Sequence, residues 1–402
     1  MQSVRLTKEA YMLKKKIYLD NAATTPISKP VLADLMDKFK NDYGNASTMY
    51  GLGRKSHAIL EHSRHIIAQS INAKDHEIIF TSGGTESDNT AIMQTAEARK
   101  NLGNHIITTS IEHEAVLRPL QYLQKKGFRV TYLPVDENGN ISLQDFKNAL
   151  DDQTILVTIM TGNNEVGSRM PIHQIGEILK NHQAWFHTDA VQAYGLLNID
   201  VKRDHIDMLS TSAHKLNGPK MIGFLYKRNG INFPSFIKGG DQESKRRAGT
   251  ENVPQISGFA TAVKNLPPST KDRLQKRYYG FKQQIVKGLK NEHVAFEVNG
   301  SMSKHNLQHV FNLWIKGVST YVMQTDLDLA GIEISGGSAC TAGSLKPSHV
   351  LTAMFGKNSP RLHESIRVSF GRFTTKSDID ALIKNIVKVV RHTKRTKRDE
   401  IK

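Results

Sequence analysis

The stretch that decides the fold class runs from Asn72 to Tyr226, where short apolar runs alternate with longer helical segments. Seven runs are too short to be typical helices and are rich in β-branched or aromatic residues. They are Glu77-Ile78-Ile79-Phe80, His105-Ile106-Ile107-Thr108-Thr109, Arg129-Val130-Thr131-Tyr132-Leu133, Ile155-Leu156-Val157-Thr158-Ile159-Met160, Trp185-Phe186-His187, Met208-Leu209-Ser210 and Ile222-Gly223-Phe224-Leu225-Tyr226. This alternation predicts an α/β domain with a mainly parallel seven-stranded sheet. A Gly/Pro/Lys turn separates the last two runs, so we expect an antiparallel edge there.

The residues beyond Pro267-Pro268 differ in character and predict a second, smaller domain. We expect a long polar helix at 271–291, followed by strands around 295–298 and 309–313. The last helix has apolar residues spaced by three and four positions, so they share one face that should pack onto a small sheet. They are Ile379, Leu382, Ile383, Ile386, Val387 and Val390. We therefore expect a large domain at 26–270 and a small α+β domain at 1–25 and 271–402.

The composition excludes several classes of protein. Of the 402 residues, 38% are hydrophobic and 23% are charged, which excludes a disordered polar chain and a collagen-like one. No apolar run approaches the roughly 20 residues that cross a bilayer. The opening residues lack the apolar stretch and cleavage site of a secretory signal, so we expect a cytoplasmic protein without a membrane segment.

The charge is strongly basic, with 55 Lys and Arg against 38 Asp and Glu and a net charge of +17. Such an excess attracts phosphate backbones. Here it is spread along the chain, and its densest run, residues 391–398, forms a basic C-terminal tail typical of a solvated helix end. We expect no direct, specific nucleic-acid binding; an acidic protein partner, or one that carries RNA, suits the charge better.

The chain has a single cysteine, Cys340, so it forms no internal disulfide and no Cys-rich zinc site. A lone cysteine is commonly buried, but this one lies in a loop of about residues 335–345 that is rich in glycine and hydroxyl residues. That composition indicates an exposed loop with an accessible thiol. His62 and His65 lie three residues apart on an expected helix, but no cluster completes a metal site, so we expect no metal.

Two polar residues at the ends of consecutive strands point to imine chemistry. Lys215 follows the strand at 208–210, in Thr211-Ser212-Ala213-His214-Lys215, and a deprotonated lysine there can form an imine with an aldehyde cofactor. Asp189 follows the preceding strand, where a carboxylate can pair with a protonated pyridine nitrogen. Alone, the lysine could be a surface residue and the aspartate a helix N-cap. Together they indicate a pyridoxal phosphate site.

Other strand ends offer a phosphate site and ring contacts. Residues 81–89, Thr-Ser-Gly-Gly-Thr-Glu-Ser-Asp-Asn, join a strand to a helix, whose N-terminus and free N–H groups favour an anion. The loop lacks P-loop and dinucleotide-binding spacing, which disfavours a nucleotide. His113 could lie over a cofactor ring or be structural, and Asn164 could donate to a ring oxygen or hold a turn.

These motifs together resemble those of pyridoxal-phosphate cysteine desulfurases, in the class V aminotransferase group with PLP fold type I, over nearly the whole chain. Residues 163–167 (Asn-Asn-Glu-Val-Gly) are one of the matching segments, and the form of Gly337-Ser338-Ala339-Cys340 resembles the branch that serves iron–sulfur assembly and tRNA thiolation. The remaining matching segments are residues 17–26, 83–89, 189–192, 212–215, 246–252 and 365–369.

The resemblance implies a role for each site residue. Lys215 would hold pyridoxal 5'-phosphate as an imine, Asp189 would pair with its pyridinium, and His113 would stack on the ring. Asn164 and Gln192 would contact the ring oxygen, and Arg367 would bind the substrate α-carboxylate together with Asn164. The phosphate would be bound by Gly84, Thr85, Ser212, His214 and, from the neighbouring subunit of a homodimer, Thr250.

The implied reaction converts L-cysteine to L-alanine and leaves a persulfide on Cys340. Lys215 would remove the Cα proton, and the Cys340 thiolate would attack the substrate sulfur. The persulfide would pass to a sulfur acceptor, either a cluster scaffold or a tRNA-thiolating enzyme. The alternatives are a selenocysteine lyase or an aminotransferase with the same cofactor, and an idle, RNA-associated binding protein without one.

Overall fold

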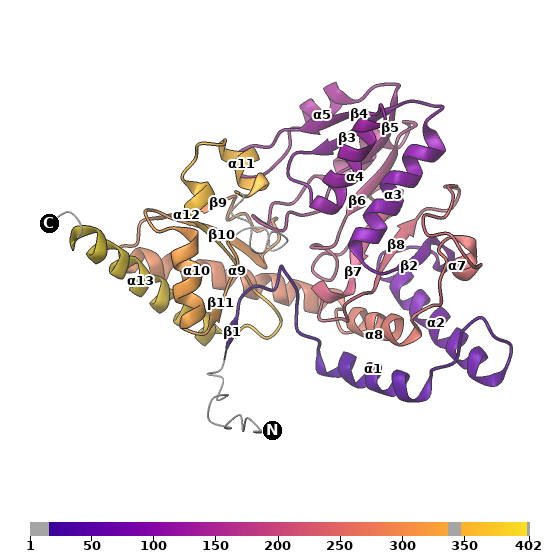
Figure 1. Ribbon diagram of the computed structural model, residues 1–402, viewed down its shortest axis with the longest axis horizontal. Helices are drawn as coiled ribbons and strands as arrows, with labels where there is room; N and C mark the ends of the chain where they lie inside the picture. Colours follow the sequence, from indigo (N-terminus) through magenta and orange to yellow (C-terminus); the bar gives the residue numbers. More distant parts are fainter. Residues whose placement is uncertain (1–15, 337–346, 400–402) are drawn as a thin grey trace, which may run out of the picture.

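The computed structural model describes residues 16–336 and 347–399. Its largest sheet has seven strands and lies in the right-hand half of the view (Figure 1). The strand order is β2-β8-β7-β6-β5-β3-β4. The strands are β2 (Ile78–Thr81), β3 (His105–Thr109), β4 (Arg129–Leu133), β5 (Thr154–Thr158), β6 (Trp185–Asp189), β7 (Met208–Ser212) and β8 (Gly223–Lys227). The expected mainly parallel sheet is therefore confirmed, within one or two residues at each strand end.

The prediction that the last two strands form an antiparallel edge of the sheet was wrong in one respect. Strand β8 does run antiparallel to β7, because the short turn between them returns the chain directly. However, β8 is not the edge strand, since β2 pairs antiparallel with its outer side. The edge strand is therefore β2, which lies more than 140 residues earlier in the sequence. A local turn signal cannot predict a pairing between such distant segments.

Alternate residues along the strands supply two apolar cores, one on each face of the sheet. Ile106, Leu156 and Met208 belong to the core beneath helices α3 and α4. Their neighbours Ile107 and Val157 face the other core, which includes residues of α2, α6 and α8. Because successive strand side chains point to opposite faces, the continuous apolar runs are explained by burial on both sides.

The helices of this part of the chain cover both faces of the sheet. They are α1 (Lys29–Asn41), α2 (Gly51–Gln69), α3 (Gly84–Arg99), α4 (Glu114–Lys125), α5 (Leu143–Ala149), α6 (Ile172–Leu179), α7 (Gln242–Lys245) and α8 (Val253–Lys264), with short 3-10 turns η2 (Asp75–Glu77) and η3 (Ala213–Lys215). Side-chain caps fix several starts. For example, the Ser142 hydroxyl accepts from the Asp145 N–H and begins α5.

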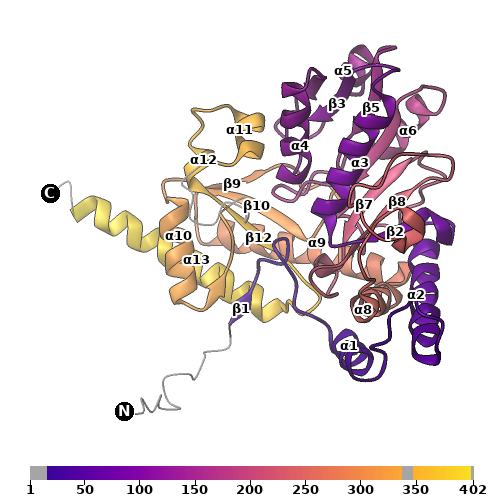
Figure 2. The ribbon, with the colours of Figure 1, turned by 45° about the vertical axis from the view of Figure 1, so that its right-hand side comes forward.

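A second group of elements lies beside the large sheet (Figure 2). Its three-stranded antiparallel sheet has the order β12-β10-β9, and β1 pairs in parallel with β11. The elements are β1 (Ile17–Tyr18), β9 (Phe296–Asn299), β10 (Val310–Ile315), β11 (Ile332–Glu333), β12 (Ser365–Ser369), α9 (Pro268–Asn291), α10 (Thr320–Leu329), α11 (His349–Phe355), α12 (Arg361–Glu364) and α13 (Lys376–Asp399). The N-terminal strand therefore returns to the C-terminal elements.

The long C-terminal helix α13 packs through the face that its spacing predicts. Ile379, Leu382 and Ile386 are fully buried, and α13 contacts α9 and α10. Gly288 of α9 allows the close approach, since a Cβ there would come within 2.8 Å of Ile383. Within the described residues, no helix is long and apolar enough to span a bilayer.

A buried carboxyl group, Glu112, joins the ends of two central strands. Its oxygens accept from the Thr109 hydroxyl (2.7 Å) and from the Met160 N–H (2.9 and 3.1 Å), which lie just at or beyond β3 and β5. Burial raises the pKa of Glu112 to about 8. The folded chain therefore holds this group as a neutral acid across a pH range in which the unfolded chain ionises it.

This linkage gives a pH-dependent stability that a Glu112→Gln variant should remove. Because the folded pKa is raised, the stabilising effect of protonated Glu112 is full below the unfolded pKa near ~4.3 and falls as the pH rises toward 8, by about 1.4 kcal/mol per pH unit. Urea unfolding at pH 5.5 and 7.5 should show the variant gaining stability relative to wild type at the higher pH. An unchanged difference at the two pH values would contradict the assignment.

Candidate active site

The loops that follow the carboxyl ends of β2, β3, β5, β6 and β7 surround a cavity of about 490 Å³. These five strands run parallel to one another, so their carboxyl ends meet at one edge of the sheet, where open α/β sheets bind ligands. All predicted site residues line this cavity except Thr250 and Cys340. The structure therefore brings these residues together at one cavity, and their roles there stay predictions.

Lys215 enters the cavity from the 3-10 turn η3, directly after β7. Its Nζ donates to the carbonyl oxygens of Ala22 (2.6 Å) and Ala23 (2.9 Å). These carbonyls belong to the segment after β1, which the Ser369 hydroxyl holds through the Ala22 N–H (2.8 Å). The amine of Lys215 is thus oriented by residues from two other, distant parts of the chain.

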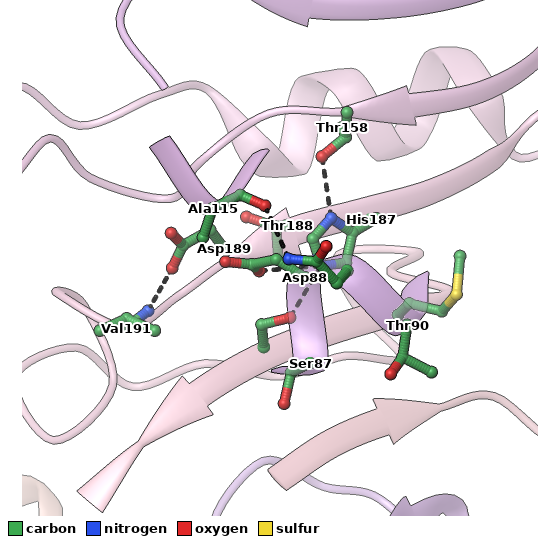
Figure 3. A network of polar contacts seen from close by, with 12 residues as sticks. Ser87, Asp88, Thr90, Ala115, Thr158, His187, Thr188, Asp189 and Val191 are labelled. Carbon is green, nitrogen blue, oxygen red and sulfur yellow. Dashed lines mark hydrogen bonds and ion pairs between the residues drawn. The ribbon is translucent and has the colours of Figure 1, made fainter. Parts of the chain in front are cut away.

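Asp189 ends β6 and is largely buried at the cavity wall. Its Oδ1 accepts from the Val191 N–H at 2.8 Å, which fixes the carboxylate (Figure 3). Burial raises the pKa of Asp189, and the nearby His113 and Lys215 oppose that rise. A cation or protonated ring nitrogen in the cavity would stabilise the ionised form further.

His113 is the N-cap residue of α4, and its Nδ1 accepts from the Ala115 N–H at 3.1 Å. An accepting Nδ1 places the proton of the neutral imidazole on Nε2. The cap therefore fixes both the ring orientation and the tautomer. His113 therefore has a structural role as the N-cap of α4, and it also lines the cavity; its contact with a cofactor ring stays a prediction.

The N-terminus of α3 forms an anion cradle on one side of the cavity. Gly83 has a φ of +148°, and a Cβ on Gly84 would come within 2.6 Å of the Val191 side chain, so both positions favour glycine. Thr85 follows in the first turn of this 16-residue helix. Ser212 and His214 face the cradle from the end of β7. Burial, with Lys215 and Lys220 nearby, lowers the pKa of His214 to about 4, so it stays neutral at physiological pH.

Gln192 is held by a partner that the sequence did not reveal. Its Oε1 lies 2.9 Å from Nε2 of His309, and its Nε2 donates to the Ala22 carbonyl at 3.0 Å. Burial lowers the pKa of His309 to about 3, so this neutral ring donates to the amide oxygen. The amide orientation of Gln192 is therefore fixed. His309 lies 117 residues away in the sequence, and no local motif connects the two.

Arg367 reaches the cavity from β12, where it is almost fully buried. Its guanidinium donates to Oδ1 of Asp20 (2.8 Å) and to the Asn164 carbonyl oxygen (3.0 Å). Within the described residues its Nε has no hydrogen-bond partner. A buried guanidinium with donor capacity left over is suited to bind a carboxylate. This arrangement also places Asn164 beside Arg367.

Two predicted residues are not brought to the cavity. Thr250 is exposed, as expected for a residue that would act in a neighbouring subunit, and it does not line the cavity of its own chain. Cys340 lies outside the described residues. The cavity also receives a segment to which we assigned no role: Ala22, Ala23 and Thr24 line it from the loop after β1. The sequence feature that could have identified this segment is the motif at residues 17–26.

The donor set fits pyridoxal 5'-phosphate. An amine that can bind an aldehyde, a carboxylate for a ring nitrogen and a glycine cradle at a helix N-terminus all face one cavity. Bound there, the cofactor would draw on Lys215, Asp189 and the α3 N-terminus. Among the described residues, no group of three or more His, Cys, Asp or Glu side chains is placed to hold a metal.

Comparisons with known proteins agree with this geometry. The family model described as "Aminotransferase class-V" matches residues 17–382. The chain is 53% identical over 377 residues to "Putative cysteine desulfurase IscS 1" of Bacillus subtilis, covering 94% of this chain and 99% of that protein. It is 41% identical over 385 residues to "Cysteine desulfurase IscS" of Clostridium botulinum, covering 94% and 95% of the two chains.

Solved structures give the same result. A "NifS-like protein" superimposes with a TM-score of 0.87 at 32% identity, covering 94% of this chain and all of that one. A structure titled "SspA in complex with cysteine" has a TM-score of 0.77 at 35% identity and covers 89% of this chain and all of that one. Because the family model and the relatives span almost the whole sequence, the chain belongs to the aminotransferase class-V family.

Proposed function

We propose that this protein is a pyridoxal-phosphate-dependent cysteine desulfurase. The reaction takes L-cysteine and an enzyme thiol to L-alanine and an enzyme persulfide, so the atoms balance without an external oxidant. The observation that carries the proposal is the convergence of Lys215, Asp189 and Arg367 on one cavity. The relatives named cysteine desulfurases, at 41–53% identity over nearly the whole chain, support the same activity.

The residues around the cavity divide into those that hold the cofactor and those that hold the substrate. Lys215 would bind the cofactor aldehyde, Asp189 would pair with the ring nitrogen, and His113 would contact the ring. Gln192 and Asn164 would contact the ring oxygen. The phosphate would be bound by Gly84, Thr85, Ser212 and His214, with Thr250 of a second subunit.

The substrate carboxylate binds Arg367, whose guanidinium is already oriented by Asp20 and Asn164. Preformed hydrogen bonds reduce the entropy lost when the carboxylate binds. Pyridoxal phosphate, when bound, supplies an electron sink for the pair left at Cα after proton removal. Lys215 accepts that proton at Nζ, and the Ala22 and Ala23 carbonyls hold this atom in the cavity.

Sulfur then passes to Cys340, the single cysteine of the chain. Its thiolate attacks the substrate sulfur, an S–S bond forms, the C–S bond breaks, and the carbon that loses sulfur gains a proton to give alanine. We propose that the persulfide passes on to a protein acceptor, either an iron–sulfur scaffold or a tRNA-thiolating enzyme. A cytoplasmic location suits this chemistry, because thiols stay reduced there.

Two substitutions separate cofactor binding from sulfur transfer. The Cys340→Ser variant should keep the yellow colour of the bound cofactor and lose sulfide release in the presence of a reductant, by about 100-fold or more. The Lys215→Ala variant should lose both the colour and the activity. Visible absorption spectra and sulfide assays of the purified variants provide the measurement. Unimpaired turnover by the Cys340 variant would contradict the persulfide step.

The runner-up activities are distinguished by products. An aminotransferase needs a keto-acid co-substrate, whereas a desulfurase produces alanine from cysteine without one. A selenocysteine lyase would favour selenocysteine over cysteine, which a competition assay with both amino acids measures. A catalytically idle binding protein would show no cofactor absorbance at all.

We propose that the protein acts as a homodimer, and a stripe of exposed apolar side chains on and after α1 supports this. Leu32, Met36 and Phe39 are spaced by four and three residues, so they share one face of α1, and Tyr43 follows just after the end of the helix. Each of the four is at least half exposed. An apolar stripe of this kind is typical of a surface that another chain covers. A dimer would also bring Thr250 of one subunit to the site of the other.

We also propose that the chain divides into a large domain at 26–270 and a small one at 1–25 and 271–402. The pairing of β1 with β11, with Ile17 opposite Ile332, supports the assignment of the N-terminal residues to the small domain. The antiparallel sheet β12-β10-β9 would form its centre. Arg367 on β12 then reaches the cavity of the large domain, so the proposed substrate site depends on both parts.

Charges placed in the α1 stripe should separate the subunits. A Met36→Asp/Phe39→Asp double variant should weaken dimerisation by about 100-fold or more, because two carboxylates cannot be desolvated without partners. Light scattering after size exclusion should then give the mass of one chain. Tyr321→Asp, at an equally exposed aromatic residue on α10, is the control and should keep the wild-type mass. A dimeric double variant would contradict the assignment of this face.

A further inference from the structure

Behind the cavity wall, four side chains from neighbouring elements form a buried polar network, and Figure 3 labels three of them, Asp88, His187 and Thr158. Asp88 comes from α3, His187 from β6, Thr158 from β5 and Ser210 from β7. All four are at most 1% exposed. The resemblance to known desulfurases assigned no role to any of them. Asp88 is of particular interest because it also lines the cavity, where it lies near Asp189.

His187 is at the centre of the network. Its Nδ1 lies 2.8 Å from the Thr158 hydroxyl, and its Nε2 lies 2.9 Å from the Ser210 hydroxyl. Nε2 is also 3.6 Å from Oδ1 of Asp88, which is too long for a hydrogen bond. Burial lowers the pKa of His187 to about 3, so the ring is neutral. It therefore supplies no positive charge to balance an Asp88 carboxylate.

Asp88 is an unusual buried acid. Within the described residues its Oδ1 has no hydrogen-bond partner, although the atom is fully buried. Burial and the neighbouring Asp189 carboxylate raise the pKa of Asp88 well above its usual range, and a hydrogen bond with Ser210 opposes only part of that rise. An ionised Asp88 would be stabilised by this one hydroxyl and by no paired cation, which leaves most of the cost of burying its charge uncompensated.

The groups around Asp189 differ from those around Asp88, because several of them stabilise a negative charge. His113 and Lys215 both favour its ionised form, and the Val191 N–H donates to it. Two buried carboxyl groups close to each other cannot both ionise without a large repulsion. The negative charge of the pair therefore resides on Asp189, which lies near Lys215 and accepts from the Val191 N–H, and the proton resides on Asp88.

We propose that Asp88 is a positioning residue, an uncharged carboxylic acid beside the neutral His187 and Ser210 that keeps the negative charge of the pair on Asp189. The inference rests on the proposed function, because it concerns the residue that pairs with the cofactor ring nitrogen. An ionised Asp88 would repel the Asp189 carboxylate and favour its protonation. It would thereby weaken the partner that keeps the ring nitrogen protonated.

The test compares three variants of the cofactor-loaded enzyme. Asp88→Asn keeps the shape and the neutral state of the group, and Asp88→Ala removes it. Asp42→Asn is the matched control, because Asp42 is an equally buried aspartate at the C-terminal end of α1 that pairs with Lys38 and Lys55. The measured quantities are the pH midpoint of the visible absorption band and the dissociation constant of pyridoxal phosphate from the apoprotein.

We expect Asp88→Asn and Asp42→Asn to keep the wild-type midpoint. Asp88→Ala should also keep the midpoint, because the variant has no carboxyl group at this position that could compete with Asp189 for the charge. If Asp88 is ionised in the native enzyme, Asp88→Asn removes a charge near Asp189 and shifts the midpoint by about one pH unit or more, which would overturn the proposal. A shift of that size in Asp88→Ala, with an unchanged midpoint in Asp42→Asn, would overturn it as well.

These outcomes are distinct from a failure of the proposed function. A wild-type chain that binds no pyridoxal phosphate would refute the proposed activity before any variant is compared. A wild-type chain that binds it normally, combined with a shifted midpoint in Asp88→Asn, would refute only the role of Asp88. If Asp88→Ala does not fold, the Asp88→Asn midpoint still decides the question, since this variant preserves the side-chain volume.

Discussion

The parallel pairing of β6 with β7 is the constraint on which the site depends. It sets Asp189 opposite Ser210, so both strands end at the same edge of the sheet, and Lys215 follows within a single short turn. A slip of one residue in this register would turn Asp189 to the other face of the sheet. The flanking apolar residues prevent such a slip, because Phe186 and Leu209 are fully buried in one core and Met208 in the other.

Much of this arrangement could be predicted from the sequence, because it is built from local patterns. The strand before Lys215 and the strand before Asp189 were recognised from their apolar runs, and parallel strands bring their ends together by necessity. The place of β8 could not be predicted in the same way. Its pairing with β2 joins residues about 145 positions apart, such as Phe80 and Phe224, and no spacing rule within either segment specifies that neighbour.

The parts of the site that were missed share one physical feature: they are contacts between distant segments that use ordinary residues. The Ala22 carbonyl accepts from both Lys215 and Gln192, and any residue type could supply a carbonyl there. His309, the residue just before β10, orients Gln192. A single histidine in an apolar stretch gives no local sequence signal for such a role. Motifs identify the reactive groups, whereas the groups that orient them become visible only once the chain is folded.

Few groups around the cavity carry a charge, and this explains how a strongly basic protein builds a selective site. Burial keeps His187, His214 and His309 neutral. It also keeps the Glu112 carboxyl neutral at physiological pH. Few charges therefore remain close to the proposed chemistry, chiefly those of Asp189, Lys215 and Arg367. Because Asp189 and Arg367 are largely buried, their charges act more strongly than they would at the surface. Because these groups are fixed by hydrogen bonds before any ligand arrives, their fields need no reorganisation during the reaction.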